Sequence, residues 1–449
     1  MLRSALPALV FGLLVILPEW TAAQPDLRLH GSNTVGEELA PALIRGWLES
    51  EGYSRIEETE TAPLERLFIG VDPAGETLTI ELHAHGSSTG FRGLASGRAD
   101  LGMSSRRIRQ QEVEQLSPMG RLDDARHEFV IGIDGLAVIV HPSNPIDALS
   151  IEQIRGVFSG RIDNWARLGG PNLPIRRYAR DEQSGTFDSF DSMVMQDAAL
   201  ARDSERFESS SELSDRVSRD PGGIGFIGLP YIDRAKALSV SAGGAAVPPE
   251  RFSSATEDYP LSRRLYLYVP EDQIDGPGGR LADFAVSRAG QARVDEIGFV
   301  GQAIEIEQLA LPEDAPSAYR EYVRGAWRAS MNFRFEPQRA VLDSKSRRDL
   351  DRLIDHLNQV AERPYEVLLM GFADPSETSP YFSLSLSNDR VQYVAEILAR
   401  AGLRVPTARG FGDALPLAEG TGESAAAKNR RVEVWLRPIE GSRQRRNAG

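Results

Sequence analysis

Residues 78–90 read LTIELHAHGSSTG, a short alternating strand followed directly by a turn of glycine, serine and threonine. Leu78, Ile80 and Leu82 recur with the period of two that is typical of a strand with one buried face. Apolar strands alternate with helical stretches in this way from Asp26 to about Glu307. The pattern predicts an α/β fold for this part of the chain.

Two other apolar runs support the same fold class. The stretch 136–140 reads LAVIV and ends at a His-Pro pair, and the stretch 264–269 reads RLYLYV and ends at Pro270. Proline has no backbone N–H and cannot continue a sheet ladder. Both runs are therefore predicted to be buried strands that end at a proline.

Two further turns, at 31–36 (GSNTVG) and 184–186 (SGT), combine glycine with hydroxyl residues between a strand and a helix. Backbone N–H groups at a helix start, joined by serine and threonine hydroxyls, form a donor-rich cradle for an oxyanion. Arg180, four residues before Ser184, adds a guanidinium suited to a charge-assisted contact. One such turn is typical of an ordinary cap or loop. Three turns and an arginine favour an anion site.

The composition limits the class of protein. The chain has 449 residues, a hydrophobic fraction of 41% and a charged fraction of 26%, which predict two or three globular domains. The formal net charge of −14 argues against nucleic acid or an anionic membrane as the general partner. The absence of cysteine excludes disulfides and thiol catalysis.

The first 23 residues have the order of a Sec-type signal peptide. Arg3 precedes an apolar stretch at 5–17, and small residues follow at 21–23. We expect cleavage near Ala23 and a periplasmic protein; an uncleaved anchor is the alternative. At the other end, residues 439–449 carry arginines without an apolar period and are predicted to be a flexible basic tail.

A second domain is predicted at 331–438, after a proline-bearing, charged linker at 308–330. Its opening strand contains Phe333 and Phe335, and a helical apolar period follows. The strand-helix order then repeats, and the alternating stretch 431–436, RVEVWL, supplies a last strand. The first domain is accordingly expected at 24–307.

Catalysis has no positive support in the sequence. The six histidines show no HExxH spacing, and there is no P-loop, dinucleotide fingerprint or Gly-x-Ser-x-Gly elbow. His83 and His85 alternate on an expected strand, where two metal ligands are conceivable, but an edge or solvent face is the simpler interpretation. We expect no enzyme, no cofactor and no metal site.

The first domain resembles the phosphate-type (PstS-like) solute-binding proteins of ABC importers. The resemblance rests on the three turns, on 99–106 (ADLGMSSR), on Arg180 and on 222–226 (GGIGF), which recur in that family's order. It implies a two-lobed, type II periplasmic-binding-protein fold that closes on phosphate or a similar oxyanion. The residues that it places at the anion are Ser32, Thr34, Val35, Ser87, Ser105, Arg106, Arg180, Ser184, Gly185 and Thr186.

One position departs from that family. Known phosphate binders carry an aspartate that accepts the proton of hydrogen phosphate, and the aligned position here is Ser105. A carboxylate acceptor repels fully ionised sulfate, so its loss weakens strict phosphate selectivity. Arg106 and Arg107 follow directly, and the sequence leaves open whether they line the cleft or are solvated at a helix start.

The second domain resembles the small α+β OmpA-like domain that binds peptidoglycan. The matching stretches are the opening strand, 371–374 (GFAD), 386–390 (LSNDR), 410–412 (GFG) and 429–433 (NRRVE). The resemblance implies that Asp374 and Arg390 hold the diaminopimelate of the peptide stem, with Arg430 in support. A turn cap at Asp374 and a surface ion pair at Arg390 are the alternative. Phe372 and Ser383 depart from the family's usual histidine and asparagine.

Together these features predict a periplasmic phosphate-binding protein held without covalent attachment at the peptidoglycan or outer membrane, serving phosphate capture or uptake. The sequence leaves open whether an ABC importer permease is a partner. The competing hypothesis is a structural or sensory envelope protein that uses a receptor-like fold for anion sensing or protein contacts, without transport. Tethering to the wall limits the diffusion that a transport shuttle needs.

Overall fold

The computed structural model describes residues 24–182, 184–311, 315–359, 365–419 and 423–439. The expected signal peptide, 1–23, and all of the expected basic tail except Ile439 lie outside the described residues. In the described part of the chain, no helix combines the length and apolar character that a membrane span requires.

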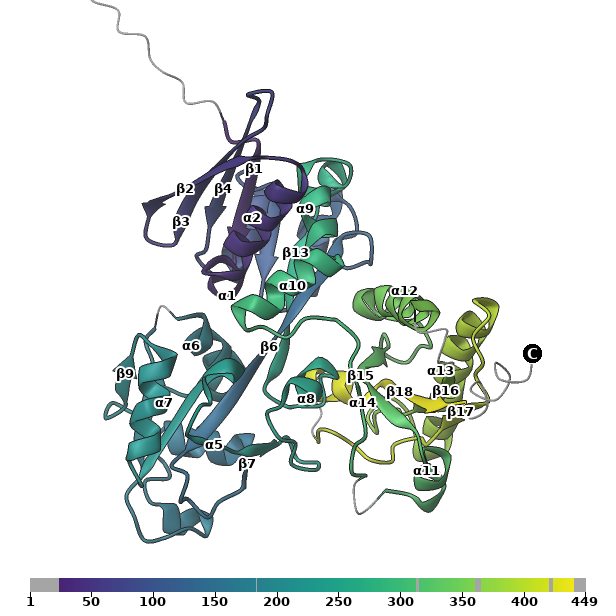
Figure 1. Cartoon of the computed structure of the whole chain (residues 1–449). Helices are drawn as coiled ribbons and strands as arrows, with labels where there is room; N and C mark the ends of the chain where they lie inside the picture. The colour runs from purple at the N-terminus through teal and green to yellow at the C-terminus, as the bar shows by residue number, and fades with distance from the viewer. Residues whose placement is uncertain (1–23, 183, 312–314, 360–364, 420–422, 440–449) are drawn as a thin grey trace, which may run out of the picture.

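The first lobe is built on one end of a large mixed sheet, in the strand order β2-β3-β4-β1-β5-β13. Strand β1 runs parallel to both β4 and β5, so the carboxyl ends of these three strands meet at one edge. Helices α2, α9 and α10 cover one face around Trp47 and Leu43 (Figure 1). The elements are β1 (Leu27–Gly31), α1 (Asn33–Gly36), α2 (Leu39–Ser50), β2 (Arg55–Ala62), β3 (Glu65–Val71), β4 (Thr77–His83), α3 (Ser87–Ala95), β5 (Leu101–Ser104), α4 (Gln110–Gln115), β13 (Ser262–Tyr268), α9 (Pro277–Val286) and α10 (Arg288–Ile297).

The second lobe continues the sheet in the order β6-β10-β8-β9, with β11 also paired to β6. In its core Phe190 stacks on Phe226, and the Phe158 ring meets both edge-on. Its elements are β7 (Ala148–Ser150), α5 (Ile151–Phe158), β8 (Arg176–Arg180), α6 (Gly185–Phe190), β9 (Glu205–Phe207), α7 (Ser210–Arg219), β10 (Gly223–Gly228), β11 (Lys236–Ala237), β12 (Ser239–Ser241) and α8 (Arg251–Ala255).

One long strand, β6 (Glu128–Val140), joins the two lobes (Figure 1). Its first half pairs with β13 and its second half, Leu136–Val140, pairs with β10. The return crossing is made at Leu261, whose carbonyl accepts a hydrogen bond from the Leu136 N–H at 3.0 Å. Every residue of β6 is buried. This confirms the two-lobed periplasmic-binding-protein fold, with 134–136 and 261–262 as the crossing segments.

The C-terminal domain is a smaller sheet in the order β14-β15-β18-β16-β17, and it confirms the α+β fold predicted for this part. Helices α12 and α13 pack on one face around Phe333, Leu353 and Val394. The elements are β14 (Ile306–Glu307), α11 (Ser317–Tyr322), β15 (Trp327–Arg334), α12 (Ser344–Gln359), β16 (Tyr365–Gly371), α13 (Pro380–Arg400), β17 (Thr407–Gly410), α14 (Glu423–Asn429) and β18 (Arg431–Pro438).

The predicted linker, 308–330, is in large part packed structure. Helix α11 lies on the opposite face of the small sheet, where the Tyr319 ring contacts those of Phe411 and Trp435 at centroid distances of 5.4 and 6.2 Å. Strand β15 begins at Trp327, inside the predicted linker, and it pairs with β14, which comes just before the linker in sequence. The prolines and charges of this stretch suggested that it has no core. Tyr319 is nevertheless buried, because it packs against the sheet of the C-terminal domain.

The two domains meet through a buried network of charges. Arg264 of β13 donates to Glu257 at 2.9 Å and to Asp343 of the C-terminal domain at 2.7 Å. Lys428 donates to the carbonyls of Glu257 and Tyr259, both at 3.0 Å. The network therefore attaches the C-terminal domain at residues 257–264, next to the crossing between the lobes.

Each lobe also contacts the C-terminal domain directly. From the first lobe, Arg107 of the stretch after β5 bonds Glu336 at 3.1 Å. From the second lobe, the Ala242 carbonyl accepts a hydrogen bond from the Glu419 N–H at 2.8 Å. The C-terminal domain thus contacts both lobes and the crossing segment at once.

Inside the C-terminal domain, Glu433 gives a prediction for acid stability. Burial alone would raise the pKa of this carboxyl, but Arg328 at 3.6 Å, Arg431 at 3.0 Å and the Tyr319 hydroxyl lower it to about 2. A depressed folded-state pKa contributes stability that is present above the unfolded value of about 4.3 and is lost as the pH falls towards 2. We expect this carboxyl to contribute about 3 kcal/mol, lost over that window.

The measurement is the melting temperature of the protein as a function of pH. In Glu433→Gln the acid-dependent loss should be smaller between pH 4.5 and 2, because the group no longer titrates. The exposed Glu396→Gln serves as the control, since Glu396 has a side chain that is 65% exposed. Identical pH profiles for wild type and Glu433→Gln would contradict the prediction.

Candidate functional site

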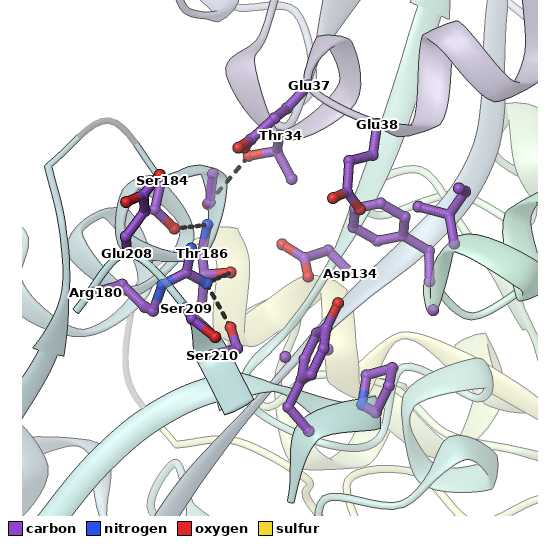
Figure 2. A pocket seen from close by; sticks show the side chains of 18 residues that line it. Thr34, Glu37, Glu38, Asp134, Arg180, Ser184, Thr186, Glu208, Ser209 and Ser210 are labelled. Atoms are coloured by element: carbon purple, nitrogen blue, oxygen red, sulfur yellow. Dashed lines mark hydrogen bonds between the residues drawn. The ribbon is translucent and has the colours of Figure 1, made fainter. Parts of the chain in front are cut away.

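A cavity of about 310 Å³ lies between the two lobes (Figure 2). Five of the residues predicted at the anion line it: Thr34, Arg180, Ser184, Gly185 and Thr186. Thr34 comes from the turn after β1 in the first lobe, and the other four lie at the end of β8 and in the turn after it, in the second lobe. The strand ends therefore bring two turns, about 150 residues apart in sequence, to opposite sides of one cavity.

Arg180, the last residue of β8, is held against the second lobe. Its Nε donates to the Phe207 carbonyl at 3.2 Å, and one terminal nitrogen donates to the hydroxyls of Ser210 and Thr186. The Ser184 hydroxyl caps α6 by accepting the Thr186 N–H at 3.2 Å. This turn is a helix cap, as the sequence allowed, and it also faces the cavity (Figure 2).

Thr34 and Gly185 close the cavity where the lobes touch. The Thr34 hydroxyl donates to the Gly185 carbonyl at 3.2 Å and accepts from Arg263 at 2.8 Å. A side chain at Gly185 would stand 2.7 Å from the Thr34 Cα, so only glycine permits this approach. The contact between the turns belongs to a closed arrangement of the lobes.

The other predicted residues lie outside the wall of this cavity: Ser32, Val35, Ser87, Ser105 and Arg106. Ser87 and Ser105 bind each other, because the Ser105 N–H donates to the Ser87 hydroxyl at 3.1 Å. Arg106 forks onto Glu112 of α4 at 2.7 and 2.8 Å, an ion pair that the sequence did not predict. Ser32 is fully buried, and its Oγ has no hydrogen-bond partner among the described residues.

Sequence reasoning missed the acidic residues of the cavity. Glu37, Glu38, Asp134 and Glu208 all contribute carboxylates to its lining. Burial raises the pKa of Glu37, although the backbone N–H of Gly185 binds this carboxylate and opposes the shift. The Glu37 side chain thus lies on a donor of the third turn, where an anion is expected. Its position directly after the first turn, at 31–36, was the one available signal.

Arg263, next to the cavity, was also missed. It extends from β13 and contacts Asp134 of β6 at 3.3 Å, while one of its terminal nitrogens donates to both Thr34 of the first lobe and Ser189 of the second. Its side chain is 11% exposed. Arg263 therefore connects both lobes from the crossing strand, a role that depends on tertiary structure and leaves no motif in sequence.

In the C-terminal domain, Asp374 and Arg390 are both buried and both bound to other residues of the chain. Arg390 forks onto Glu377 at 2.6 and 2.8 Å, and neither side chain is more than 3% exposed. Asp374 accepts from the Asn429 amide at 2.8 Å and from the Ser376 N–H at 2.8 Å. Burial would raise the pKa of Glu377, but the bonds from Arg390 hold it below its ordinary value.

The structure thus brings Asp374, Arg390 and Arg430 into one neighbourhood around Glu377. Arg430 lies 4.0 Å from Glu377, and its Nε donates to the Phe335 carbonyl at 3.2 Å. Glu377 was not predicted, because it shows its role only through the contact with Arg390, 13 residues further along the chain. The Glu377 carboxylate therefore binds Arg390, the arginine that the resemblance expects to bind the carboxylate of the ligand.

Comparison with known proteins bears on both domains. The model of the PBP superfamily domain matches residues 71–288. Protein SphX of Synechococcus elongatus is 31% identical over 240 residues, which cover 50% of this chain and 69% of that protein. The chain belongs to the PBP superfamily. The model of the OmpA family matches residues 334–430, so an OmpA-family domain follows the superfamily domain in the same chain.

Further similar proteins carry names that refer to phosphate. The phosphate-binding protein PstS of Borreliella burgdorferi is 26% identical over 247 residues, covering 53% of this chain and 85% of that protein. Among solved structures, an ABC-type phosphate transport receptor from Vibrio cholerae is 23% identical with a TM-score of 0.47, covering 61% of this chain and 99% of its own. The PBP superfamily match includes Ser87, Arg180 and Ser184, and the OmpA-family match includes Asp374 and Arg390.

Proposed function

We propose that this protein is a phosphate-binding receptor of the periplasm, attached to peptidoglycan through its OmpA-family domain. The observation that carries the first half is the arrangement of Arg180 and the Ser184-Gly185-Thr186 turn opposite Thr34 across one cavity. A guanidinium with hydroxyl and backbone donors matches a tetrahedral oxyanion. Relatives named phosphate-binding proteins support phosphate as the anion.

The cavity also offers a basis for phosphate over sulfate. Hydrogen phosphate carries a proton that needs an acceptor, whereas sulfate has none and is repelled by a carboxylate. Glu37 and Asp134 line the cavity. In this proposal their carboxylates provide the proton acceptor that is lost where Ser105 replaces the family's aspartate. In this proposal the anion takes the Gly185 N–H that Glu37 now occupies, and a carboxylate accepts its proton.

Titration calorimetry of the mature protein with phosphate, sulfate and acetate tests the receptor function. We expect submillimolar binding of phosphate and weaker or no binding of the other two anions. The absence of heat with every anion would overturn the proposal and favour the structural or sensory alternative. The internal carboxylate at Gly185 is the observation that supports this alternative, because it satisfies one donor of the third turn without a ligand.

The attachment to peptidoglycan is supported by two buried residues in one neighbourhood, Asp374 and Arg390. A zwitterionic amino acid such as diaminopimelate requires a carboxylate for its ammonium group and a guanidinium for its carboxylate. Both groups are present, but Glu377 holds Arg390 by two hydrogen bonds. Binding of a peptide stem would therefore exchange one carboxylate for another at Arg390.

This exchange predicts that Glu377→Gln binds peptidoglycan more tightly. The neutral amide keeps the shape of the side chain but competes less well for the guanidinium, since charge-assisted bonds are about twice as strong as neutral ones. We expect roughly tenfold tighter binding, or about 1.4 kcal/mol, in co-sedimentation with peptidoglycan sacculi. The exposed Glu396→Gln on α13 is the matched control. Equal binding by wild type and Glu377→Gln would contradict the exchange.

The transport role is a separate part of the proposal. A receptor that delivers phosphate to an ABC importer must reach a permease in the inner membrane. Co-purification of the full chain with an importer, with and without peptidoglycan digestion, distinguishes transport from capture at the wall. Recovery of the importer only after digestion would indicate that the tethered population does not deliver phosphate.

A further inference from the structure

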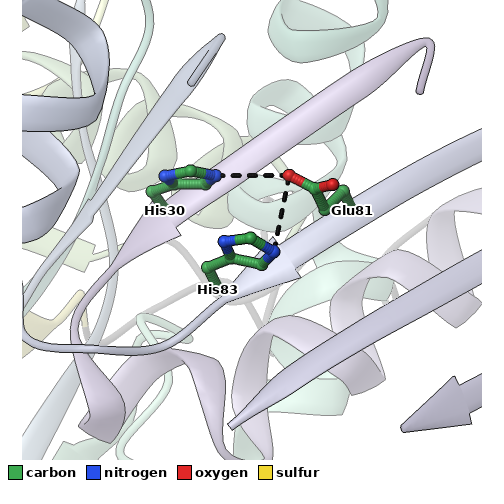
Figure 3. Close-up of side chains that lie close together, drawn as sticks. All are labelled: His30, Glu81 and His83. Carbon is green, nitrogen blue, oxygen red and sulfur yellow. Dashed lines mark hydrogen bonds and ion pairs between the residues drawn. The ribbon is translucent and has the colours of Figure 1, made fainter. Parts of the chain in front are cut away.

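A cluster of histidine and glutamate side chains stands on one face of the first-lobe sheet, apart from the cavity (Figure 3). The register pairs His30 of β1 with His83 of β4, and His83 with Glu65 of β3. Because successive side chains of a strand alternate, Glu81 lies on the same face as His83. Glu81 and His83 are two positions apart in the sequence, and every other pair among these four residues is 16 to 53 positions apart. Sheet pairing brings them together.

The three nearest ligand atoms have the spacing that a small cation requires. Glu81 Oε1 lies 3.4 Å from His30 Nε2 and 3.5 Å from His83 Nε2. Zinc binds nitrogen and oxygen ligands at about 2.0–2.2 Å in a tetrahedron, which places two ligands about 3.4 Å apart. The imidazole rings of His30 and His83 are stacked, with centroids 4.4 Å apart, and both present Nε2 to the carboxylate (Figure 3).

The surroundings hold these side chains in place while leaving access from solvent. His30 is 13% exposed and packs against Gly93 of α3, where an added Cβ would stand 3.1 Å from the ring Nδ1. The neighbouring cation on this face, Arg28, is bound by Asp100 at 2.7 Å. A second carboxylate, Glu65, lies 3.7 Å from His83 Nε2 and is oriented by His85 at 2.9 Å.

We propose that His30, Glu81 and His83 bind a divalent transition metal ion of the zinc type, with Glu65 as the adjacent carboxylate. Two imidazoles and one carboxylate are ligands that such ions prefer, and Ca²⁺ or Mg²⁺ would require more oxygen ligands. The bound ion would fasten β1 to β4. Both strands lead into glycine-hydroxyl turns, at 31–36 and 86–90, and the first of these lines the cavity through Thr34.

The test uses the full mature chain without a histidine tag, stripped with a chelator and kept in phosphate-free buffer. Zn²⁺ is titrated by calorimetry, and metal content is measured after gel filtration. Co²⁺ is titrated separately, since a tetrahedral site gives it characteristic visible absorption. We expect one equivalent of metal per chain, and a melting temperature that rises with metal concentration.

His83→Ala and Glu81→Gln should each weaken metal binding by at least about tenfold and remove the Co²⁺ spectrum. The matched control is His141→Ala, because His141 is only partly buried and lies in the other lobe. Glu81→Gln keeps the size of the side chain, so it tests the site even if His83→Ala alters the fold. Wild type that binds no metal, variants that bind like wild type, or equal loss in His141→Ala would each overturn the proposal.

Discussion

In Arg180→Ala, the dissociation constant for phosphate should rise by about two orders of magnitude. Arg180 supplies a guanidinium to the wall of the cavity, where Glu37, Asp134 and Glu208 contribute opposite charge. Removing one partner of a desolvated charge pair costs about 2–5 kcal/mol, and about 3 kcal/mol corresponds to a hundredfold. Titration calorimetry of phosphate against wild type and variant measures the ratio.

The matched control for this prediction is Arg219→Ala. Arg219 belongs to the same lobe and carries the same charge, but its side chain is 69% exposed and pairs with the local Asp215 at 3.1 Å. We expect its phosphate affinity to be within a few-fold of wild type. Unchanged affinity in Arg180→Ala, or an equal loss in both variants, would show that the anion does not bind at this turn.

The second large effect is expected at the junction of the domains. Arg264→Ala leaves the carboxylates of Glu257 and Asp343 without their closest shared cation. Breaking a buried ion pair by removing one partner costs about 3–5 kcal/mol, because the remaining charge stays desolvated. We expect a markedly lower melting temperature and, in calorimetry, separate transitions of the PBP-superfamily and OmpA-family domains.

Arg400→Ala serves as the control for this effect. Arg400 and Glu396 form an exposed pair on α13, with side chains 78% and 65% exposed. Exposed pairs contribute about 0–1 kcal/mol, so the control should unfold like wild type. A single transition at the wild-type temperature in Arg264→Ala would mean that this network does not couple the domains.

The parts of this protein that could be predicted from sequence are those in which local order carries the signal. Alternating strands followed by glycine-hydroxyl turns predicted the α/β class, and the Phe333 and Phe335 strand with its helices predicted a second domain. The resemblances built on short motifs then implied the two-lobed fold and the α+β fold of the second domain. For the cavity, Thr34 and the Ser184-Gly185-Thr186 turn were found in the same way, since each is a short motif.

The parts that could not be predicted depend on which strands and lobes meet. Arg263 and Asp134 acquire their positions only where β13 and β6 cross between the lobes. Glu377 reaches Arg390 through the folding of α13 onto the sheet, and His30 meets His83 only through the β1–β4 register. Tyr319 was assigned to a linker because its flanking prolines and charges gave no sign of the aromatic cluster it joins.

The seating of the C-terminal domain has a mechanical consequence. That domain contacts the first lobe at Arg107, the second lobe at Ala242 and the crossing at Arg264. Lobes that change their angle must slide or break at least one of these contacts. A pulling force on the C-terminal domain would therefore change the angle between the lobes. In the same way, a ligand bound in the cleft would change how strongly the C-terminal domain is held against the lobes.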